Sequence, residues 1–475
     1  MTKSLGRSIL LSEIILTTTL ALLFLGEKSL WLDEVFSITL ARDWTGIWSF
    51  MLRNNANMWL YYTLLYFWLN LGESEFIVRG LSAIFVIATV PVIYVLGTRL
   101  FGARVGMLAG LLLALNAFFI HYAQEARSYS LLVFLTTLSS YFFVRGVGET
   151  SWKHWGGYAI TITLAMYAHY FGALVLVAHI TSLVIPRKGK IPWKGLAISG
   201  VATVLLLLPL ALFQPLGIGQ PTWVQPPEVD DIRQLFIALA GGSHKLLLVY
   251  LSLCFVALGF AVVRFRDKSP PKIWRYAFLA IWLLAPVVIA FVISRLLRPI
   301  FVDRYLIICL PPFVLLTATG LSNINHRWIF AAILTILLIL SGRGLFVWYT
   351  GYQKENWRDA TAFVLTGAHP DEVVYFYLVR EPFEYYLSRS NVPSDFLNLM
   401  GPDDPPDLEL LESLSDEYTR VWLVLSHDQM SHLGRDVQSR LIQSSLERHY
   451  TLIREEKFKG VRVLLYQRMS SESKQ

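Results

Sequence analysis

Apolar runs long enough to cross a lipid bilayer recur along most of this chain, and they constrain its fold more than any other feature. Each run covers about 17 to 22 residues, and about 20 apolar residues in a helix span the hydrocarbon core. The first run, Ile9–Leu25, follows Lys3 and Arg7, and no small-residue cleavage site of a secretory signal comes after it. The chain is therefore expected to be an integral, multi-pass membrane protein.

Composition agrees with this expectation. Hydrophobic residues make up 55% of the 475 residues and charged residues only 16%, whereas an average soluble protein carries about 25% charged residues. The net charge of +7 does not indicate nucleic acid binding, because the basic residues fall in short loops between the apolar runs. Cys254 and Cys309 both lie inside apolar runs, which favours buried free thiols over a disulfide.

A topology of about eleven spans with a cytoplasmic N-terminus satisfies the positive-inside rule. The basic loops at 187–190 and 264–275 then lie inside. The aromatic run Trp59–Leu71 is too short for a confident crossing, and we expect it to lie in the interface. Counting it as a span would move both basic loops outside. The predicted spans cover residues 9–25, 76–96, 105–119, 129–144, 157–168, 171–185, 196–213, 246–263, 277–293, 306–321 and 328–348.

Two domains follow from this topology: a transmembrane domain at 1–349, with an outer loop at 26–74, and an extracytoplasmic domain at 350–475. The tail alternates helix-like and strand-like segments, which is typical of a small α/β domain. The acidic, proline-rich stretch Pro402–Leu411 is predicted to be a surface loop. The predicted helices are Glu355–Leu365 and Arg435–Leu446, and the predicted strands are Glu372–Leu378, Arg420–Ser426, Tyr450–Ile453 and Val461–Tyr466.

Polar residues gather at the predicted outer rim of the membrane. Asp33 and Glu34 follow the first span almost directly, and a charge at this depth is costly unless it has a function. On position alone, the simpler alternative is that the pair ends a span in solvated headgroups. The same face holds Arg79, His121, Glu125, Arg127, His169, Arg295, Arg298, Asp303 and Arg304.

Arginines on the outer face run against the positive-inside rule and so require another explanation. Arginine binds phosphate through a planar fork of donors and keeps its charge when partly desolvated, so the set indicates an anion held near the membrane surface. Structural pairing, such as Asp303 with Arg304, is the alternative for any single arginine. A histidine at a span tip, such as His121 or His169, is more often an interfacial anchor than a catalytic group.

Carboxylates and arginines together predict a group-transfer chemistry. A carboxylate can accept the proton of an acceptor hydroxyl, and arginines can stabilise the charge on a departing phosphate. A sugar carried on a membrane-embedded polyprenyl phosphate would present its anomeric carbon between the two. Attack from the face opposite the phosphate inverts the configuration at that carbon, with one carboxylate as the base. An inverting glycosidase uses its base in the same way. No separate acid is required, because phosphate is already a good leaving group.

An ordered set of motifs also resembles a known family. After the acidic pair come Glu75–Ala83, Arg99–Arg104, Tyr122–Tyr129 and Asp303–Leu306. At these spacings the chain resembles, from about Leu30 to Trp357, the bacterial protein-mannosyltransferase and aminoarabinose-transferase (ArnT-like) group. These are membrane glycosyltransferases of the GT-C fold, in glycosyltransferase family 39. The expected fold is thus an all-α, polytopic GT-C domain followed by the small α/β domain.

The resemblance implies roles for particular residues. Asp33 is implied as the base and Glu34 as its neighbour, with Arg79 and Arg127 near the lipid phosphate. The implied partners are a polyprenyl-phosphate-linked sugar donor, a glycan, lipid or protein acceptor, and the lipids of a bacterial cytoplasmic membrane. The expected donor-binding set is Arg79, Arg127, Arg298, Arg304, Glu125, His169 and Tyr129.

The chain departs from the family at one place. Family members often carry His-Pro-Pro or Lys-Pro-Pro before the dipping helix, whereas this chain has Asn55–Trp59. The change removes a titratable or cationic group near the donor. Glu34, His121 and His169 are the ligand-type residues available there, so a divalent metal stays open and unassigned.

Two other functions compete with a transferase. A transporter or flippase for a lipid-linked or anionic substrate would also have many spans, but transporters usually show internal repeats and broken helices near the midplane. No clear repeat is present, and the polar groups gather at one face. A non-catalytic scaffold that binds polyprenyl lipids would hold the lipid phosphate with the arginines, and Asp33 would have a structural role. In the transferase, the loop at 214–244 could order over bound donor as a lid.

Overall fold

The computed structural model resolves the chain into two compact units. It describes residues 3–53, 57–149, 151–186, 191–213, 224–266, 270–351, 354–401, 406–427 and 435–469. The first unit comprises Met1–Leu25 and Leu40–Thr350, and the second comprises Gly26–Thr39 and Gly351–Gln475. We expected a single boundary near residue 350. The start of the predicted outer loop, Gly26–Thr39, instead groups with the C-terminal residues.

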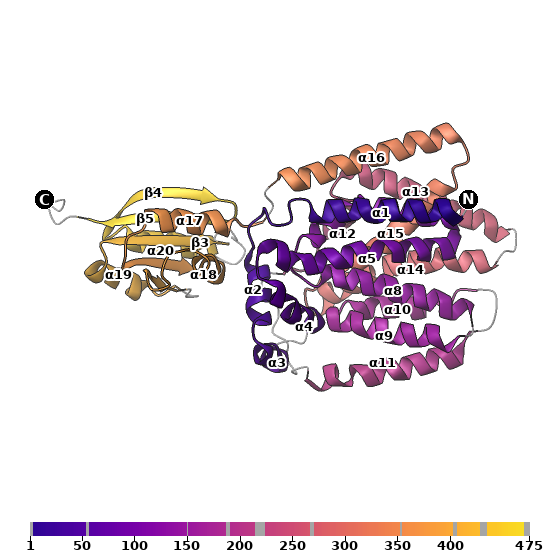
Figure 1. Ribbon diagram of the computed structural model, residues 1–475, viewed down its shortest axis with the longest axis horizontal. Helices are drawn as coiled ribbons and strands as arrows, with labels where there is room; N and C mark the ends of the chain where they lie inside the picture. Colours follow the sequence, from indigo (N-terminus) through magenta and orange to yellow (C-terminus); the bar gives the residue numbers. More distant parts are fainter. Residues whose placement is uncertain are drawn as a thin grey trace. The chain divides into compact units, whose positions relative to one another are not determined.

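All regular secondary structure in the described part of the first unit is helical (Figure 1). Their bounds are α1 Lys3–Leu22, α3 Trp44–Arg53, α4 Trp59–Trp68, η1 Leu69–Leu71, α5 Glu75–Phe101, α6 Ala103–Ala114, α7 Ala117–Ala123, α8 Tyr129–Gly148, α9 Trp152–Ala168, α10 Gly172–Ser182, α11 Trp193–Phe213, α12 Val229–Leu239, α13 His244–Arg266, α14 Pro270–Leu296, η2 Tyr305–Cys309, α15 Leu310–Ser322 and α16 Arg327–Thr350. Another helix, α2 (Leu32–Ala41), begins in the second unit.

Several of these helices can cross a membrane. Among the described residues, eight helices are long and apolar enough, or nine if the bent pair of α6 and α7 is one span. Helices α9 and α10 are shorter, with 17 and 11 residues. With these two, every one of the predicted spans is helical. The prediction of an all-helical, multi-pass membrane domain is confirmed, and α4, at 10 residues, is too short to span a core of about 30 Å.

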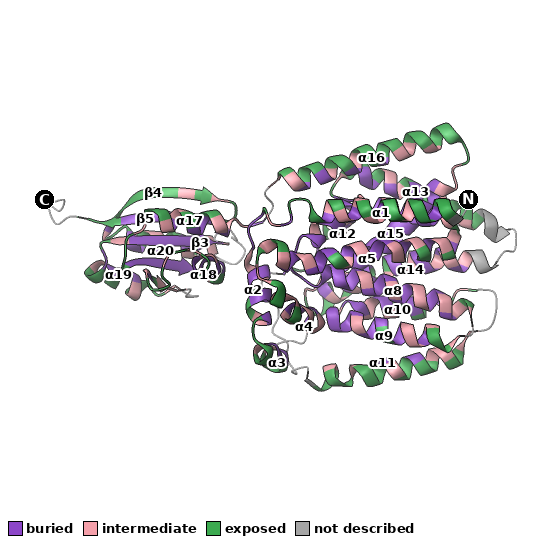
Figure 2. Cartoon of the chain, in the orientation of Figure 1, coloured by how far each residue is buried: buried purple, intermediate pink, exposed green. Residues whose placement is uncertain are grey.

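Burial separates the centre of the bundle from its periphery (Figure 2). In an apolar 18-residue stretch of the span formed by η2 and α15, 89% of the residues are buried. The corresponding shares are 11% in α11 and 17% in α16. The exposed residues of α11 and α16 are largely apolar. Since lipid tails are as apolar as leucine, such faces are stable against a bilayer.

Close packing of α13 against α15 depends on a glycine. A Cβ atom added at Gly320 in α15 would lie 1.9 Å from the carbonyl oxygen of Leu253 in α13. Overpacking of this kind costs about 1–3 kcal/mol, so Gly320→Ala is expected to lower the thermal unfolding temperature of the purified chain. Gly259→Ala is the matched control, because a Cβ there meets nothing within 4 Å. Equal unfolding temperatures for the two variants would contradict this packing.

Two predictions in the first unit need correction. The third predicted span is broken between α6 and α7, which are bent by 62°. The side chain of Asn116 causes the break, because it caps α7 at Phe119 N–H (3.0 Å) and donates to the Leu239 carbonyl (2.9 Å). The predicted loop at 214–244 contains α12, which a capping box between Glu228 and Asp231 starts. Residues 214–223 of that predicted lid lie outside the described residues.

A mixed, five-stranded sheet forms the centre of the second unit (Figure 1). The strands are β1 Glu372–Tyr377, β2 Leu397–Met400, β3 Arg420–Ser426, β4 Tyr450–Phe458 and β5 Val461–Arg468. Their order is β2-β1-β3-β5-β4. β1 pairs in parallel with β2 and β3, with Val373 opposite Val421, and β5 is antiparallel to both β3 and β4.

Alternating side chains of β1 and β3 enter two separate cores, as the period of two in a strand requires. Val374 and Trp422 lie in a core with Trp357 of α17 (Trp357–Gly367). Val373 and Val421 lie in the other core, against α19 (Leu408–Glu417) and α20 (Arg435–Leu446). The prediction of a small α/β domain is therefore confirmed.

Some details of this domain were not predicted. The stretch Pro402–Leu411 was expected to be a loop, but α19 begins at Leu408, where Asp407 accepts the N–H of Leu410 at 3.0 Å. Helix α18 (Glu381–Leu387) and strand β2 were missed. β4 extends to Phe458, because an edge strand tolerates the charged residues at 454–457 that ended the predicted strand.

An ion pair at the end of β3 makes the second unit sensitive to pH. His427 Nε2 lies 2.9 Å from a Glu355 carboxylate oxygen, and this hydrogen bond raises the pKa of His427 despite its partial burial. Because the folded-state pKa exceeds the unfolded value of about 6.5, the stabilisation is fully present below that value. It is lost as the pH rises through the folded-state pKa.

We therefore expect His427→Asn to weaken β3 only at low pH, by about 1 kcal/mol or less. Hydrogen exchange of β3 peptides in the full chain, compared with the wild type at about pH 5 and about pH 8, measures the difference. A difference that is equal at the two pH values would contradict the role of the ion pair.

Candidate active site

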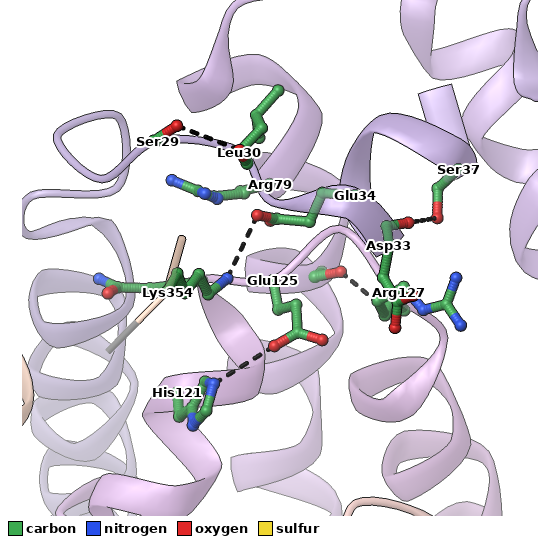
Figure 3. Close-up of polar contacts among 12 residues, drawn as sticks. Ser29, Leu30, Asp33, Glu34, Ser37, Arg79, His121, Glu125, Arg127 and Lys354 are labelled. Carbon is green, nitrogen blue, oxygen red and sulfur yellow. Dashed lines mark hydrogen bonds and ion pairs between the residues drawn. The ribbon is translucent and has the colours of Figure 1, made fainter. Parts of the chain in front are cut away.

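The acidic pair lies in the second unit, in the first turn of α2. Glu34 is fully buried and its carboxylate lies 3.3 Å from Lys354 Nζ (Figure 3). Asp33 is partly exposed, and its carbonyl accepts a hydrogen bond from Ser37 Oγ at 2.8 Å. The two adjacent carboxylates therefore differ in environment, which sequence alone did not predict.

Arg79 is a buried arginine on α5 in the first unit, with 1% of its surface exposed. Its Nη1 donates to the Leu25 carbonyl at 3.1 Å. One turn further along α5, Ser82 Oγ donates to the Arg127 carbonyl at 3.2 Å and shares a hydrogen bond with Tyr61. The N-terminal part of α5 thus supports both the end of the first span and the turn that carries Arg127.

That turn, between α7 and α8, carries two of the predicted residues. Glu125 is 3% exposed and Arg127 is 9% exposed. Arg127 Nη1 donates to Tyr62 Oη at 3.4 Å, which links the turn to α4. Glu125 pairs with His121 Nε2 at 3.2 Å (Figure 3).

His121 has a structural environment. Its ring stacks on Tyr122, with centroids 4.6 Å apart, and on Trp348, at 4.1 Å. Trp348 Nε1 in turn donates to Gln124 Oε1 at 3.0 Å. These contacts, with the Glu125 pair, fit the interfacial anchor that was the alternative for this histidine.

His169 lies between α9 and α10 and is 2% exposed. Its ring packs against Tyr305, with centroids 4.7 Å apart, and against Tyr129, at 6.2 Å. Asn57 Oδ1 accepts the N–H of the next residue, Tyr170, at 3.1 Å. Asn57 therefore holds the backbone next to His169.

The protonation of His169 follows from its surroundings. Burial, and then the charges of Arg127 and Arg304, lower the pKa of His169 to about 3, so the imidazole is neutral near pH 7. Nδ1 accepts the Phe171 N–H at 3.2 Å, which assigns the proton to Nε2. Nε2 is buried and makes no hydrogen bond within the part of the chain that the structure describes.

Arg127, His169 and Arg304 thus form a group within the first unit that we call the basic cluster. Arg304 follows α14, and its guanidinium lies 5.7 Å from the Tyr305 ring centroid. The cluster combines two arginine side chains and a neutral N–H donor with aromatic neighbours. Such a group favours an oxyanion, because charge-assisted hydrogen bonds are strong when desolvated.

The other predicted residues have different surroundings. Arg298 is exposed in the segment after α14. The Asp303 carboxylate accepts the backbone N–H of Arg304 at 2.7 Å. Tyr129, fully buried, belongs to the aromatic wall beside His169. Asp33 and Glu34 lie in the other unit.

Lys354 and Tyr386 are residues that sequence analysis missed. Together with Arg358, they contact the segment before α2 or its first turn. Their pairings join residues more than 300 positions apart, so no local pattern could reveal them. Among the described residues, no group of three His, Cys, Asp or Glu side chains is arranged to hold a metal ion.

Comparison with known sequences finds one family. A family model described as dolichyl-phosphate-mannose-protein mannosyltransferase matches residues 56–213, which include Arg79, Arg127 and His169. No curated protein matches the chain in sequence.

Solved structures share the architecture over nearly the whole chain. The apo crystal structure of ArnT from Cupriavidus metallidurans is 14% identical, covers 98% of each chain and has a TM-score of 0.63. The same enzyme bound to undecaprenyl phosphate is 13% identical, covers 99% of each chain and has a TM-score of 0.60. The Archaeoglobus fulgidus oligosaccharyltransferase, in complex with Zn and sulfate, is 11% identical over 97% of this chain and 73% of that one, with a TM-score of 0.57.

These similarities confirm the predicted GT-C fold and the resemblance to the protein-mannosyltransferase and ArnT group. They extend from the transmembrane helices through the C-terminal sheet, since the ArnT match covers 98% of the chain.

Proposed function

We propose that this chain is an inverting glycosyltransferase. It moves a sugar from a polyprenyl-phosphate-linked donor to an acceptor hydroxyl on the extracytoplasmic side of the membrane. The observation that carries the proposal is the basic cluster, in which the buried His169 Nε2–H lies among the charges of two arginines. The similarity to ArnT, a protein solved with undecaprenyl phosphate, supports a polyprenyl-phosphate-dependent glycosyltransferase in general.

The basic cluster suits the phosphate of such a donor. Arg127 and Arg304 supply charge that persists after desolvation, and His169 supplies a directed donor without adding charge. The rings of Tyr129 and Tyr305 pack around His169, and an apolar surrounding strengthens charged hydrogen bonds. A lipid-linked phosphate also explains why outward-facing arginines are retained in a membrane protein, because the lipid chain can remain in the bilayer while the head group reaches them.

The reaction requires one proton transfer and one displacement. The acceptor hydroxyl oxygen attacks the anomeric carbon from the face opposite the phosphate, and Asp33 takes the hydroxyl proton. The bond between the anomeric carbon and the phosphate oxygen breaks, and its electron pair leaves with the polyprenyl phosphate. The configuration at the anomeric carbon inverts, and Asp33 then returns its proton to water. The basic cluster stabilises the phosphate charge that develops.

Asp33 belongs to the second unit and the basic cluster to the first. Arg79 and Glu125 are buried in the first unit and support the segments near the basic cluster. Arg298 is exposed and provides a positive charge for an approaching anionic head group. Glu34 is already paired with Lys354, which is a poor arrangement for a metal ligand. We therefore derive no step through a metal ion.

Purified full-length chain incubated with a panel of hexosyl and pentosyl polyprenyl phosphates tests the proposal. We expect one donor to yield free polyprenyl phosphate together with a product of inverted anomeric configuration, detected by mass and by NMR. Retention of configuration would contradict the single displacement. Consumption of no donor in the panel, in the presence of membrane extract as acceptor source, would contradict the transferase function.

A transporter is the second candidate, and the break between α6 and α7 favours it, because transporters use broken helices at their binding sites. Liposomes that contain the purified chain separate the two functions. A transporter would move labelled lipid-linked sugar across the bilayer with the sugar bond intact, whereas the proposed enzyme breaks that bond.

A further inference from the structure

The two carboxylates of the acidic pair require different support. Both lie in the first turn of α2, where the helix dipole favours negative charge. The Glu34 side chain is 0% exposed, and burying a carboxylate is costly unless it is paired. Asp33 is partly exposed and keeps contact with solvent. The buried Glu34 carboxylate therefore needs a counter-charge close to it.

Lys354 supplies that counter-charge. Its Nζ lies 3.3 Å from Glu34 Oε2, and its side chain is only 5% exposed (Figure 3). Both members of the pair lie within the second unit, with Lys354 between α16 and α17. Removing one partner of a buried ion pair leaves an uncompensated charge, which destabilises the segment around it.

The backbone before α2 is held by the same C-terminal residues. Arg358 donates from both terminal nitrogens, to the Glu27 carbonyl and to the Gly26 carbonyl, each at 3.0 Å. Tyr386 Oη accepts the Leu30 N–H at 2.8 Å. These bonds fix the chain on the N-terminal side of the acidic pair.

The side chains of Ser29 and Leu32 also connect this segment to the C-terminal residues. Ser29 Oγ accepts the Arg358 N–H at 3.0 Å. Leu32 packs against the hydrophobic core that contains Trp357 and Phe383. The residues that lead to the acidic pair are thus part of the fold of the C-terminal unit, although they precede most of the transmembrane helices in the sequence.

We infer that Lys354 is a positioning residue for Asp33, an inference that rests on the proposed function. By pairing with Glu34, the Lys354 ammonium holds the first turn of α2 in one orientation, and this orients Asp33, the carboxylate that takes the acceptor proton. Misplacement of a reacting group by about 1 Å can cost about 100-fold in rate. The C-terminal unit therefore contributes to catalysis through a residue that acts on Glu34.

Hydrogen exchange of the purified full chain tests the structural half of this inference. Lys354→Met keeps much of the side-chain volume but removes the charge, and we expect faster exchange in peptides covering 26–39. Lys354→Arg keeps the charge and should restore protection. Arg420→Met is the matched control, because it removes the Arg420–Glu372 ion pair, at 2.8 Å, elsewhere in the same unit. It should leave exchange at 26–39 unchanged.

Kinetics test the functional half. We expect Lys354→Met to lower kcat by about 100-fold, while the affinity for undecaprenyl phosphate changes by less than about twofold. Lys354→Arg should recover most of kcat. The double variant Glu34→Gln, Lys354→Met removes both charges, so its loss should be smaller than the sum of the two single losses. It also serves as the test protein if Lys354→Met does not fold.

Specific results would overturn the inference. Unchanged exchange at 26–39 in Lys354→Met contradicts the positioning of the acidic pair. A lowered affinity for undecaprenyl phosphate with unchanged kcat assigns Lys354 to lipid binding instead, and full additivity of the two single losses contradicts action through Glu34. A wild-type chain that transfers no sugar contradicts the proposed function, whereas the exchange measurement does not depend on turnover, so the two failures are distinguishable.

Discussion

Asp33→Asn is expected to lower kcat by about 10²- to 10⁴-fold, the range that general base catalysis contributes. Asparagine keeps the size and hydrogen-bonding shape of the side chain but cannot take the proton of the acceptor hydroxyl. Binding of undecaprenyl phosphate should change by less than about twofold, because the proposed phosphate contacts lie in the basic cluster. Turnover of the lipid-linked sugar and a separate binding titration measure the two effects.

Asp43→Asn is the matched control for this variant. Asp43 precedes α3 and accepts the Gly46 N–H at 2.8 Å. Asparagine caps a helix about as well as aspartate, so this change should leave both turnover and stability nearly unaltered. If Asp33→Asn retained wild-type turnover, the base would have to be another residue. If it lost lipid binding as well, Asp33 would act in folding or donor binding.

Arg127→Met is expected to weaken undecaprenyl phosphate binding by about 10- to 100-fold. A hydrogen bond to a charged group contributes about 1.5–3 kcal/mol, and each 1.4 kcal/mol is about tenfold in affinity. Arg127→Lys should fall between the wild type and the methionine variant, because lysine keeps the charge but loses the planar fork. Tryptophan fluorescence or calorimetry with the purified chain gives the dissociation constants.

Arg145 provides the control at the opposite end of α8. It pairs with Glu149 at 2.8 Å, and its side chain is 29% exposed. Exposed pairs contribute about 0–1 kcal/mol, so Arg145→Met should bind the lipid as the wild type does. Equal losses in Arg127→Met and Arg145→Met would show that binding depends on overall positive charge, and would contradict a specific basic cluster.

The membrane architecture was predictable because its physical cause is local. A run of apolar residues predicts a span wherever it occurs, and arginines and lysines in the intervening loops orient it. The short helix at Trp59 was correctly kept out of the spans for the same reason. Asn116 was missed because one polar residue within an apolar run does not reveal that its side chain will cap a new helix.

The C-terminal domain was predicted only in part, again for physical reasons. Strands β1 and β3 are continuous apolar runs, because both of their faces are buried. Strand β2 has only four residues and pairs along one edge with β1, so its sequence carries little signal. Asp407 is an N-cap signal for α19 that the surrounding prolines concealed.

The candidate site divides in the same way. Its charged residues were singled out because charges at a membrane rim are rare. Arg127 and His169 are both buried in the structure. What the sequence could not provide is the partner of each group. The sequence near Glu34 does not indicate Lys354 as its partner. The sequence near His169 also does not reveal that Nε2 lacks a hydrogen-bond partner among the described residues.

Cysteine labelling of the membrane-embedded chain tests most directly whether the acidic pair and the arginines face the same side of the bilayer. A parent with the buried Cys254 and Cys309 replaced by alanine carries single cysteines at the exposed positions Thr39, Arg298 or Arg327. With an impermeant reagent on intact cells, we expect labelling at 39 and 298, and labelling at 327 only after permeabilisation. Labelling of positions 39 and 298 from opposite sides of the membrane would contradict the account.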